Sequence, residues 1–536
     1  MKQLSLKSLR FLFFLLFILV GLILFPFYKY QINPDGIAYL SIAQHYGSGR
    51  WSEALNSCWP PMISWLLAPW RLVTDELLWV FKLYNLLFGA GCLWVSFNLL
   101  EHFRVKRVFL IIGMFLLSAT YMMWAYSITT PDLLSVWIIL FYSYKIVTGK
   151  FLEQPILTGT LGALAYFAKS YCFFFFVAHI SFQFLFYAIS KKSKVKNLLI
   201  TYVKTMAVLA FFVFSWMLLL YTKYGHFTLS SASAYTHALL KNPDWKCTQS
   251  FVPPPGPNAV FPWEDPPFVC PRKDWNVFSS FENLELQISY IFKNTWNLFS
   301  MQRLNGYFHF VGFLMMLFIL LFERRDKAWS FRRWKQIPEQ PLFDLFPLIG
   351  IYTMGYLLIF IEPRYVWSAY AWISIGMIVA LQELVGDHIF NKGRLFIITS
   401  ILFLAAIAGV IYKQPRLLDP IQKVFGSKEA KYNTLDFYNN CQQLKASMKP
   451  GTNMAILGNS TGKERTQASS LAYFTQTRLF GNLPSDPYGT KRLIDQYSIA
   501  LLVVVSGQEA SVLLPDSNWI KLSPEVGNLV VYQKKK

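Results

Sequence analysis

Long apolar runs alternate with short polar connections along most of the chain. About 20 apolar residues cross a bilayer as a helix, and eleven runs are candidates for such spans. The fifth run is short, and it and the sixth form either a broken hairpin or one long kinked helix. The predicted spans are Phe11–Phe27, Leu77–Leu100, Val108–Tyr126, Leu133–Val147, Ile156–Ala168, Tyr171–Ser190, Leu198–Tyr221, Tyr307–Phe322, Phe343–Ile361, Val366–Leu384 and Leu395–Tyr412.

The connections differ in charge, and this difference orients the spans. "MKQLSLKSLR", "EHFRVKR", "KKSKVK", "ERRDKAWSFRRWK" and "NKGR" are rich in Lys and Arg, whereas the alternating connections are not. The positive-inside rule places the basic set in the cytoplasm. The basic and non-basic connections alternate along the whole chain only if the fifth and sixth runs are separate spans. The charge pattern therefore favours the hairpin. The first run lacks a small-residue cleavage site and is expected to stay as an uncleaved span.

Three regions are then expected outside the cytoplasm: the loop Tyr28–Glu76, the segment Thr222–Gly306 and the tail from Lys413. The tail has short apolar runs, "MAILG", "IALLVVV", "WIKL" and "NLVVYQ", which indicate strands. "NTLDFYNNCQQLKASMKPG" indicates a helix ending at Gly451. We therefore predict a transmembrane domain over residues 1–412, with interfacial helices in the loop 28–76 and a second outer loop over 222–306. A small extracytoplasmic α/β domain is predicted over residues 413–536.

Composition agrees with this fold class, an α-helical polytopic membrane protein with about eleven transmembrane helices. Of the 536 residues 54% are hydrophobic and only 15% are charged, with a mean hydropathy of +0.35. Soluble domains carry roughly 25% charged residues. The net charge of +21 lies largely in the cytoplasmic connections, so it orients the chain and argues against a nucleic-acid partner.

Motifs for metal or nucleotide chemistry are missing from the sequence. It has no CxxC, HExxH or Cys/His cluster that would indicate zinc, and no Walker motif. "GNSTGK" matches the Walker motif only in part, and it lies in the outer tail. The first loop has no DxD pair, and the use of a divalent cation is left open. Cys247 and Cys270 bracket the Pro-rich "VPPPGPNAVFPWEDPP", and whether they form a disulfide is also open.

The stretch "NPDGIAYLSIAQHY" after the first span carries one carboxylate. Asn33 suits an N-cap, Pro34 the first helical position and Asp35 the first turn, where a carboxylate is stabilised as the anion. Apolar residues then recur at helical spacing from Tyr39 to Tyr46, which predicts a helix lying on the membrane surface. Asp35 is either an ordinary first-turn acid or a functional carboxylate facing lipid headgroups and the outer aqueous space.

Two further stretches follow on the outer side. "WPPMISWLLAPW", from Trp59 to Trp70, predicts a second interfacial helix, for which membrane anchoring is the simplest explanation. "SITTPD" precedes the fourth span. There Thr130 is the expected N-cap, Pro131 the first helical residue and Asp132 a complement to the helix dipole, with substrate contact as the alternative.

Two cationic side chains lie at outer ends of spans. Lys169, in "GALAYFAKSY", either extends to the interface or provides a cation for a lipid phosphate. In "IEPRY", Glu362 and Arg364 either pair with each other, or Arg364 binds phosphate oxygens, next to Tyr365. A carboxylate and two cations on one face of the membrane suit transfer from a lipid-phosphate donor to a hydroxyl, with a base on the acceptor and cations on the departing phosphate.

These five motifs, in this order and on this side, resemble those of GT-C glycosyltransferases over roughly residues 1–412. Within that superfamily they are most similar to the protein-O-mannosyltransferase-like group, which includes the bacterial aminoarabinose transferase of lipid A. The resemblance implies an enzyme of the bacterial inner membrane, with its site and tail on the periplasmic side. The donor would be a polyprenyl-phosphate sugar, used with inversion, and the partners would be membrane lipid and a hydroxyl acceptor of unknown kind.

Carried over by position, the resemblance implies that Asp35 is the acidic catalytic residue and that Lys169 and Arg364 contact the donor phosphate. Further candidates for substrate contact are Tyr39, His45, Trp59, Asp132, Glu362 and Tyr365. The sequence departs from the family pattern at Gly36, where many members have an acidic or aromatic residue, and in its long Pro-rich second outer loop. The rival interpretations are a transporter or flippase of a lipid-linked substrate, and an envelope polysaccharide polymerase or ligase.

Overall fold

The structure, a computed structural model, describes residues 5–190, 195–241, 250–270, 277–300, 304–325, 328–332, 336–337, 340–385, 434–458, 460–508 and 518–535. Ten of its helices coincide with predicted spans. They are α1 (Leu6–Tyr28), α5 (Leu77–His102), α6 (Arg107–Ser127), α7 (Asp132–Val147), α8 (Pro155–Ala168), α9 (Tyr171–Ser190), α10 (Val195–Tyr224), α14 (Leu304–Leu321), α15 (Leu345–Leu357) and α16 (Trp367–Val385). The eleventh prediction, Leu395–Tyr412, lies outside the described residues.

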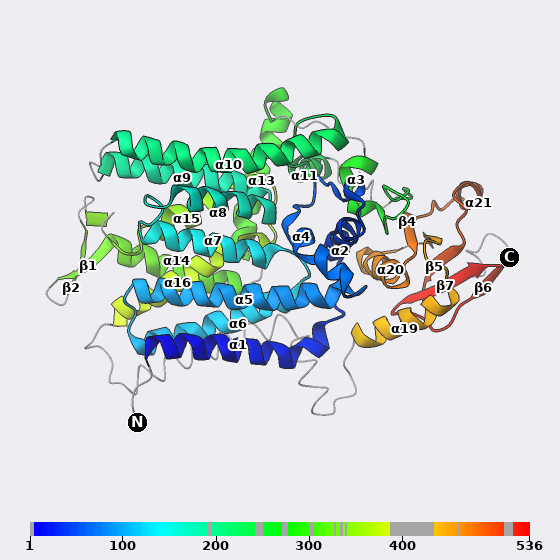
Figure 1. Cartoon of the computed structure of the whole chain (residues 1–536), viewed down its shortest axis with the longest axis horizontal. Coiled ribbons are helices and arrows are strands. Elements are labelled where there is room, and N and C mark those ends of the chain that lie inside the picture. Colours follow the sequence, from blue (N-terminus) through cyan, green and yellow to red (C-terminus); the bar gives the residue numbers. More distant parts are fainter. Residues whose placement is uncertain are drawn as a thin grey trace.

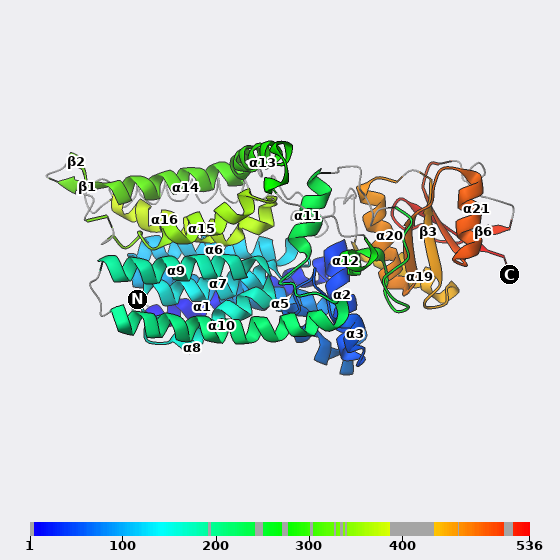
Figure 2. The same ribbon diagram turned by 90° about the horizontal axis from the view of Figure 1, so that it is seen from above.

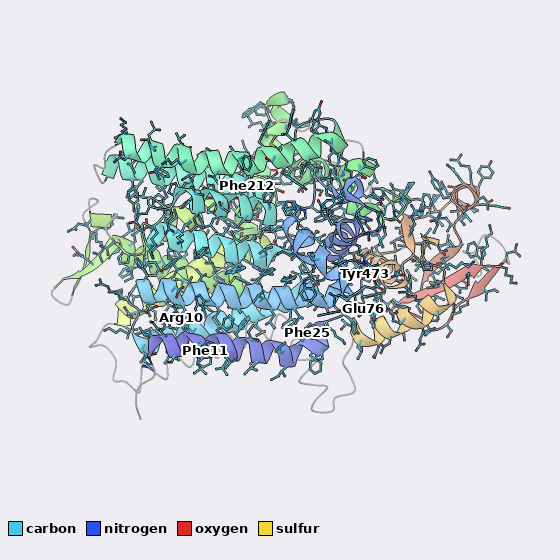
Figure 3. All side chains as sticks on the ribbon, in the orientation of Figure 1. Arg10, Phe11, Phe25, Glu76, Phe212 and Tyr473 are labelled. Carbon is cyan, nitrogen blue, oxygen red and sulfur yellow. The ribbon has the colours of Figure 1, made fainter. Side chains whose placement is uncertain are left out.

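The long helices run side by side as one bundle (Figures 1 and 2). Within the described residues, six helices are long and apolar enough to cross a membrane. The most apolar stretches of α5 and of α16 with its preceding turn are 67% and 72% buried, whereas those of α1 and α10 are 22% and 28% buried. Large apolar side chains such as Phe11 and Phe212 therefore remain exposed on the outer helices (Figure 3). Such a surface is suited to lipid, and the chain is an integral membrane protein.

The break between α8 and α9 confirms that the fifth and sixth spans are separate helices. Lys169 has an extended backbone, with φ −155° and ψ 114°, and its N–H still bonds to the carbonyl of Ala165. The two helices then pack closely, because a Cβ on Gly162 would lie 2.7 Å from the ring of Phe176.

The loop after α1 forms α2 (Pro34–Gly47), α3 (Trp51–Ala54), α4 (Met62–Leu67) and the 3₁₀ turn η1 (Ala68–Leu72). These elements lie at the end of the bundle that faces the C-terminal sheet (Figure 1). We expected α2 to lie on the membrane surface with one apolar side. Instead it is buried on nearly every side, from Gly36 to Ala43 and again at His45 and Tyr46. The expectation fails because α3, α4, η1 and the outer loop at residues 262–264 all pack around α2.

The second outer loop contains α11 (Ala232–Lys241), η3 (Pro262–Glu264), α12 (Pro266–Val269), η4 (Val277–Ser279) and α13 (Phe281–Ser300). Later connections form the hairpin β1 (Phe322–Arg325) and β2 (Ala328–Phe331), which lies at the opposite end of the bundle, and η6 (Pro363–Val366) before α16 (Figure 1). Cys270 is disulfide-bonded. Whether its partner is Cys247, which the sequence left open, is not answered, since Cys247 lies outside the described residues.

The C-terminal part is a five-stranded sheet of order β4-β3-β5-β7-β6, in which β3 is parallel to β4 and β5 while β7 is antiparallel to both neighbours. Alternate residues of β3 face opposite sides: Met454 and Ile456 join the core under α19 and α20, and Ala455 and Leu457 join the cluster under α21. The elements are α19 (Thr434–Ser447), β3 (Asn453–Leu457), α20 (Gly462–Thr475), β4 (Arg478–Asn482), α21 (Pro487–Gln496), β5 (Leu501–Val505), β6 (Trp519–Lys521) and β7 (Leu529–Lys534).

The predicted tail helix and four predicted strands are confirmed as α19, β3, β5, β6 and β7, although α19 ends at Ser447 rather than near Gly451. The sequence did not predict α20, β4 or α21. The last two residues of "GNSTGK" begin α20, and Thr461 before them is the N-cap and forms a capping box with Glu464.

Candidate functional site

Asp35 is the second residue of α2, after Pro34 at the first helical position, as the sequence predicted. Asn33 occupies the N-cap position without capping through its side chain, and its Oδ1 instead accepts a hydrogen bond of 3.0 Å from the backbone N–H of Thr129. Gly36 allows this close approach, because a Cβ there would lie 2.7 Å from the carbonyl oxygen of Thr129. The glycine that departs from the family pattern is thus explained by packing against the segment before α7.

The carboxylate of Asp35 has a partner on each oxygen. Oδ2 lies 2.8 Å from Nη1 of Arg364, and Oδ1 accepts a hydrogen bond of 2.9 Å from Nε1 of Trp263. The side chain remains 15% exposed. The carboxylate is therefore oriented by two donors from distant parts of the chain while a small part of the side chain stays exposed.

Asp132 links the two cations that the sequence singled out. Its Oδ1 forms an ion pair with Nζ of Lys169, and its Oδ2 lies 3.8 Å from Nη1 of Arg364. We expected Thr130 to cap α7 and Pro131 to be its first residue. The helix instead begins at Asp132 with Pro131 at the N-cap position, and the hydroxyl of Thr130 donates to Oδ2 of Asp132 at 2.6 Å. The capping expectation is wrong because the hydroxyl of Thr130 serves the carboxylate.

Glu362 and Tyr365 complete the network around the cations. Glu362 accepts from Nε of Arg364 at 2.7 Å, so the two side chains of the "EPRY" turn do pair. Nζ of Lys169 lies 4.2 Å from the ring centre of Tyr365, within the range of a cation–π contact. No described residue accepts a hydrogen bond from Nη2 of Arg364. Arg364 therefore retains donor capacity beyond its three carboxylate neighbours.

The other predicted residues lie on or around α2, and of these Tyr39 is close enough to Asp35, Asp132 and Arg364 to interact with their charges. The buried ring of Tyr39 packs edge-on against Trp59 at 5.3 Å, and Nε1 of Trp59 donates to the carbonyl of Trp263 at 3.0 Å. Burial raises the pKa of Tyr39 well above its usual range. His45, near the end of α2, is buried, and its Nε2 lies 3.7 Å from Glu264. Trp59 and His45 thus hold the loop that carries Trp263, and neither contacts Asp35.

Trp263 is the residue that the sequence analysis missed. Its loop is fixed by Asp265, which lies 2.8 Å from Nζ of Lys223 and accepts from the hydroxyl of Tyr224 at 2.9 Å. Burial raises the pKa of Asp265 despite the nearby ammonium of Lys223. The carbonyl of Glu264 accepts from Asn56 at 2.6 Å. The sequence marked only a Pro-rich stretch with two adjacent acids, and nothing in that stretch indicates which residue Trp263 contacts.

In the part of the chain that the structure describes, no group of three or more His, Cys, Asp or Glu side chains is arranged to hold a metal ion. The site is instead built from carboxylates, two cations and aromatic rings. It can orient a nucleophile at Asp35, and it can place the positive charges of Lys169, between α8 and α9, and of Arg364, before α16, beside an anion.

Two solved structures have a similar architecture over nearly the whole chain. They are crystal structures of ArnT from Cupriavidus metallidurans, one bound to undecaprenyl phosphate and one in the apo state. The first matches with a TM-score of 0.54 and 12% identity, and the second with 0.53 and 13%, each over 97% of both chains.

The chain has the GT-C fold. No family model matches the sequence, and no curated protein matches it either. At this identity the similarity defines the GT-C fold and its order of elements. The chemistry must come from the site.

Proposed function

We propose that the chain is a membrane glycosyltransferase that takes a sugar from a polyprenyl-phosphate donor and transfers it to a hydroxyl acceptor on the outer face of the membrane. The observation that carries this proposal is the position of Asp35, held 2.8 Å from Arg364, which itself lies 3.8 Å from the Lys169-bound Asp132. One continuous network thus contains a base and both donor cations. Support comes from the shared fold, since one ArnT structure is bound to undecaprenyl phosphate.

In the proposed reaction the acceptor hydroxyl attacks C1 of the sugar from the side of Asp35. The new bond forms between the acceptor oxygen and C1, and the bond from C1 to the phosphate oxygen breaks with its electron pair going to the phosphate. Asp35 takes the hydroxyl proton, and the configuration at C1 inverts. General base catalysis of this kind contributes about 10²–10⁴-fold in rate.

Lys169 and Arg364 would stabilise the charge that grows on the departing polyprenyl phosphate. Both already contact carboxylates, so the phosphate would share these cations rather than find them free. Nη2 of Arg364 is the donor best placed to add a phosphate oxygen without breaking the pair with Asp35. Tyr39, Trp59, Glu362 and Tyr365 would then line the site, and His45 would act on the loop of Trp263.

The placement of the charges favours transfer over transport. A transporter typically carries ionisable groups near the middle of its spans. Here Asp35, Asp132, Lys169 and Arg364 all lie at helix ends or in the turn before a helix. They gather at one end of the bundle, the same end as the C-terminal sheet. We assign that end to the periplasmic side of a bacterial inner membrane, because the basic connections are predicted on the other.

The test compares envelope glycans and glycoproteins by mass spectrometry in cells that lack the chain and in cells that carry variants. The wild-type chain and the control Asp495→Asn, which changes an exposed aspartate of the C-terminal sheet domain, should both restore one additional sugar residue on the acceptor. Asp35→Asn should restore none while reaching the membrane in normal amount. Full restoration by Asp35→Asn would refute the proposal, and the restored mass would identify sugar and acceptor together.

A further inference from the structure

A cleft of about 520 Å³ lies between the helical bundle and the C-terminal sheet. One wall comes from the end of α2, from η1 and from the start of α5, and the other from α19, α20 and the beginning of β4. Glu76 and Tyr473, both of which line it, are close together at this junction (Figure 3). The residues of the cleft do not include Asp35, Asp132, Lys169 or Arg364, so the cleft is distinct from the network described above.

Four cations line this cleft, against two carboxylates. Arg71 pairs with Asp75, and Arg50 lies 4.0 Å from Glu53. The other two, Lys445 and Arg478, form no ion pair with any described residue.

Arg478 is held by neutral oxygens only. Nη2 donates to the carbonyl of Gly256 at 3.1 Å and Nη1 to Oδ1 of Asn453 at 3.3 Å. Its Nε is buried with no hydrogen-bond partner among the described residues. The carboxylate of Glu264 acts on this guanidinium only from beyond ion-pair distance, so the half-buried positive charge that faces the cleft is only partly compensated.

The remaining lining is aromatic and amide-rich. The rings of Tyr30 and Tyr438 stack with their centres 3.7 Å apart, at one side of the cleft. Aromatic faces offer flat apolar surface, and amides both donate to and accept from hydroxyls, so the combination suits sugar rings. The other aromatic and amide side chains of the lining are Trp79, Tyr473, Phe474, Gln44, Asn258, Gln442 and Gln476.

We propose that this cleft binds an anionic saccharide and that this saccharide is the part of the acceptor remote from the reacting hydroxyl. The second clause rests on the proposed function. Gln44, on the cleft wall, is nine residues after Asp35 on the same helix, a distance of about 14 Å at 1.5 Å per residue. A saccharide of a few rings spans such a distance, and binding energy from remote rings can position the hydroxyl at Asp35.

The loop of Trp263 connects the two regions. Pro257 and Ala259 line the cleft and also a second cavity of about 240 Å³, beside His45 and Asp265. Four residues after Ala259 the chain reaches Trp263, which donates to Asp35. An occupant of the cleft therefore contacts the segment that orients the proposed base.

Carboxylated polysaccharides and phosphorylated glycolipid headgroups share the required chemistry, and a binding assay separates them. The full chain in lipid nanodiscs is titrated by isothermal calorimetry with tetragalacturonate, with glucosamine disaccharide 1,4′-bisphosphate and with neutral maltotetraose. At least one charged probe should bind at least tenfold more tightly than maltotetraose, and the tighter of the two identifies the source. Salt should weaken its binding.

Variants locate the binding. Arg478→Gln with Lys445→Gln should raise the Kd of the charged probe at least tenfold, since a charge-assisted hydrogen bond is worth about tenfold or more. Lys445→Gln alone, which removes a side chain that forms no ion pair among the described residues, should raise it severalfold. Arg478→Lys with Lys445→Arg should keep most of the affinity. The matched control, Lys491→Gln with Arg492→Gln on exposed α21, should bind like wild type.

Equal binding of charged and neutral probes, or an unchanged Kd in both the double variant and Lys445→Gln, would overturn the inference. Binding is measured without donor, so it does not depend on transfer. If the cleft binds as expected but no sugar is transferred in cells, the proposed function alone fails. If sugar is transferred and the cleft variants bind and transfer like wild type, the inference alone fails.

Discussion

Trp263→Phe is the substitution that isolates the role of the residue missed in the sequence. Phenylalanine keeps an aromatic ring against Trp59 and Tyr235, whose centres lie 5.7 and 5.5 Å from that of Trp263. It removes the Nε1–H that donates to Oδ1 of Asp35 at 2.9 Å, together with part of the ring volume. The loop itself should stay in place, because Asp265, Glu264 and Asn56 anchor it independently of the indole nitrogen.

The expected loss follows from the kind of bond removed. A hydrogen bond to a charged group is worth about 1.5–3 kcal/mol. If the whole amount is lost from the transition state, kcat falls about 10- to 100-fold. Arg364 still holds the other carboxylate oxygen at 2.8 Å, so the loss should be smaller than the 10²–10⁴-fold expected for Asp35→Asn. The donor KM should change little, because the indole contacts neither Lys169 nor Arg364.

The assay measures initial rates of sugar transfer by purified protein with the donor and acceptor found in envelope glycans. Trp70→Phe is the matched control, since Nε1 of Trp70 donates to Tyr84 at 2.9 Å on an exposed part of the outer loop. In an Asp35→Asn background, Trp263→Phe should have little further effect, because residues that act together are not additive. A wild-type kcat for Trp263→Phe, or an equal loss in both backgrounds, would refute the reasoning.

The donor cations and the loop anchor give two further predictions. Lys169→Gln and Arg364→Gln should each lower kcat/KM for the donor by about 10- to 100-fold, from a lost charge-assisted contact of about 1.5–3 kcal/mol; donor saturation curves with unchanged KM and kcat for both would contradict the phosphate assignment. Burial raises the pKa of Asp265 in the folded chain above the ordinary value of 3.8 expected in the unfolded chain. At pH values between the unfolded and the folded pKa, the folded chain therefore binds the proton more tightly. The free energy of unfolding should then fall as pH rises through that window, and Asp265→Asn should flatten this dependence; equal slopes in thermal unfolding of wild type and variant would show the reasoning to be wrong.

The sequence predicted those site residues whose location depends only on where an apolar helix ends. Asp35, Lys169 and Arg364 each lie at the end of an apolar run, and topology alone puts such ends on one side of the membrane. Their contacts through Asp132 needed the structure, because the packing of α7 against α8 sets which ends meet. Asp132 was predicted mainly as a helix-dipole complement, and its position between Lys169 and Arg364 depends on α16 as well.

Long-range contacts account for what could not be predicted. Trp263 follows Asp35 by more than 200 residues, and no local pattern indicates that a Pro-rich loop reaches back to α2. The burial of α2 has the same cause: its Tyr39–Tyr46 pattern fits a surface helix, but α4, η1 and η3 cover the remaining sides. In the tail, α20 was not predicted because many of the side chains that it buries are polar. Its capping box lies in a stretch that was compared only with the Walker motif.

Residues 250–260 of the second outer loop run along the edge of the C-terminal sheet. The N–H of Val252 bonds to the carbonyl of Phe480 at 2.8 Å, and the N–H of Leu479 to that of Val260 at 2.7 Å. The loop thus pairs with the outer edge of β4, the side that no strand of the sheet covers. Without the loop this edge would be open, and an open edge can pair with strands of other chains. The C-terminal sheet is consequently not an exchangeable module: a chimera that replaces it must also replace residues 250–260, or it will expose the edge and release the segment leading to Trp263.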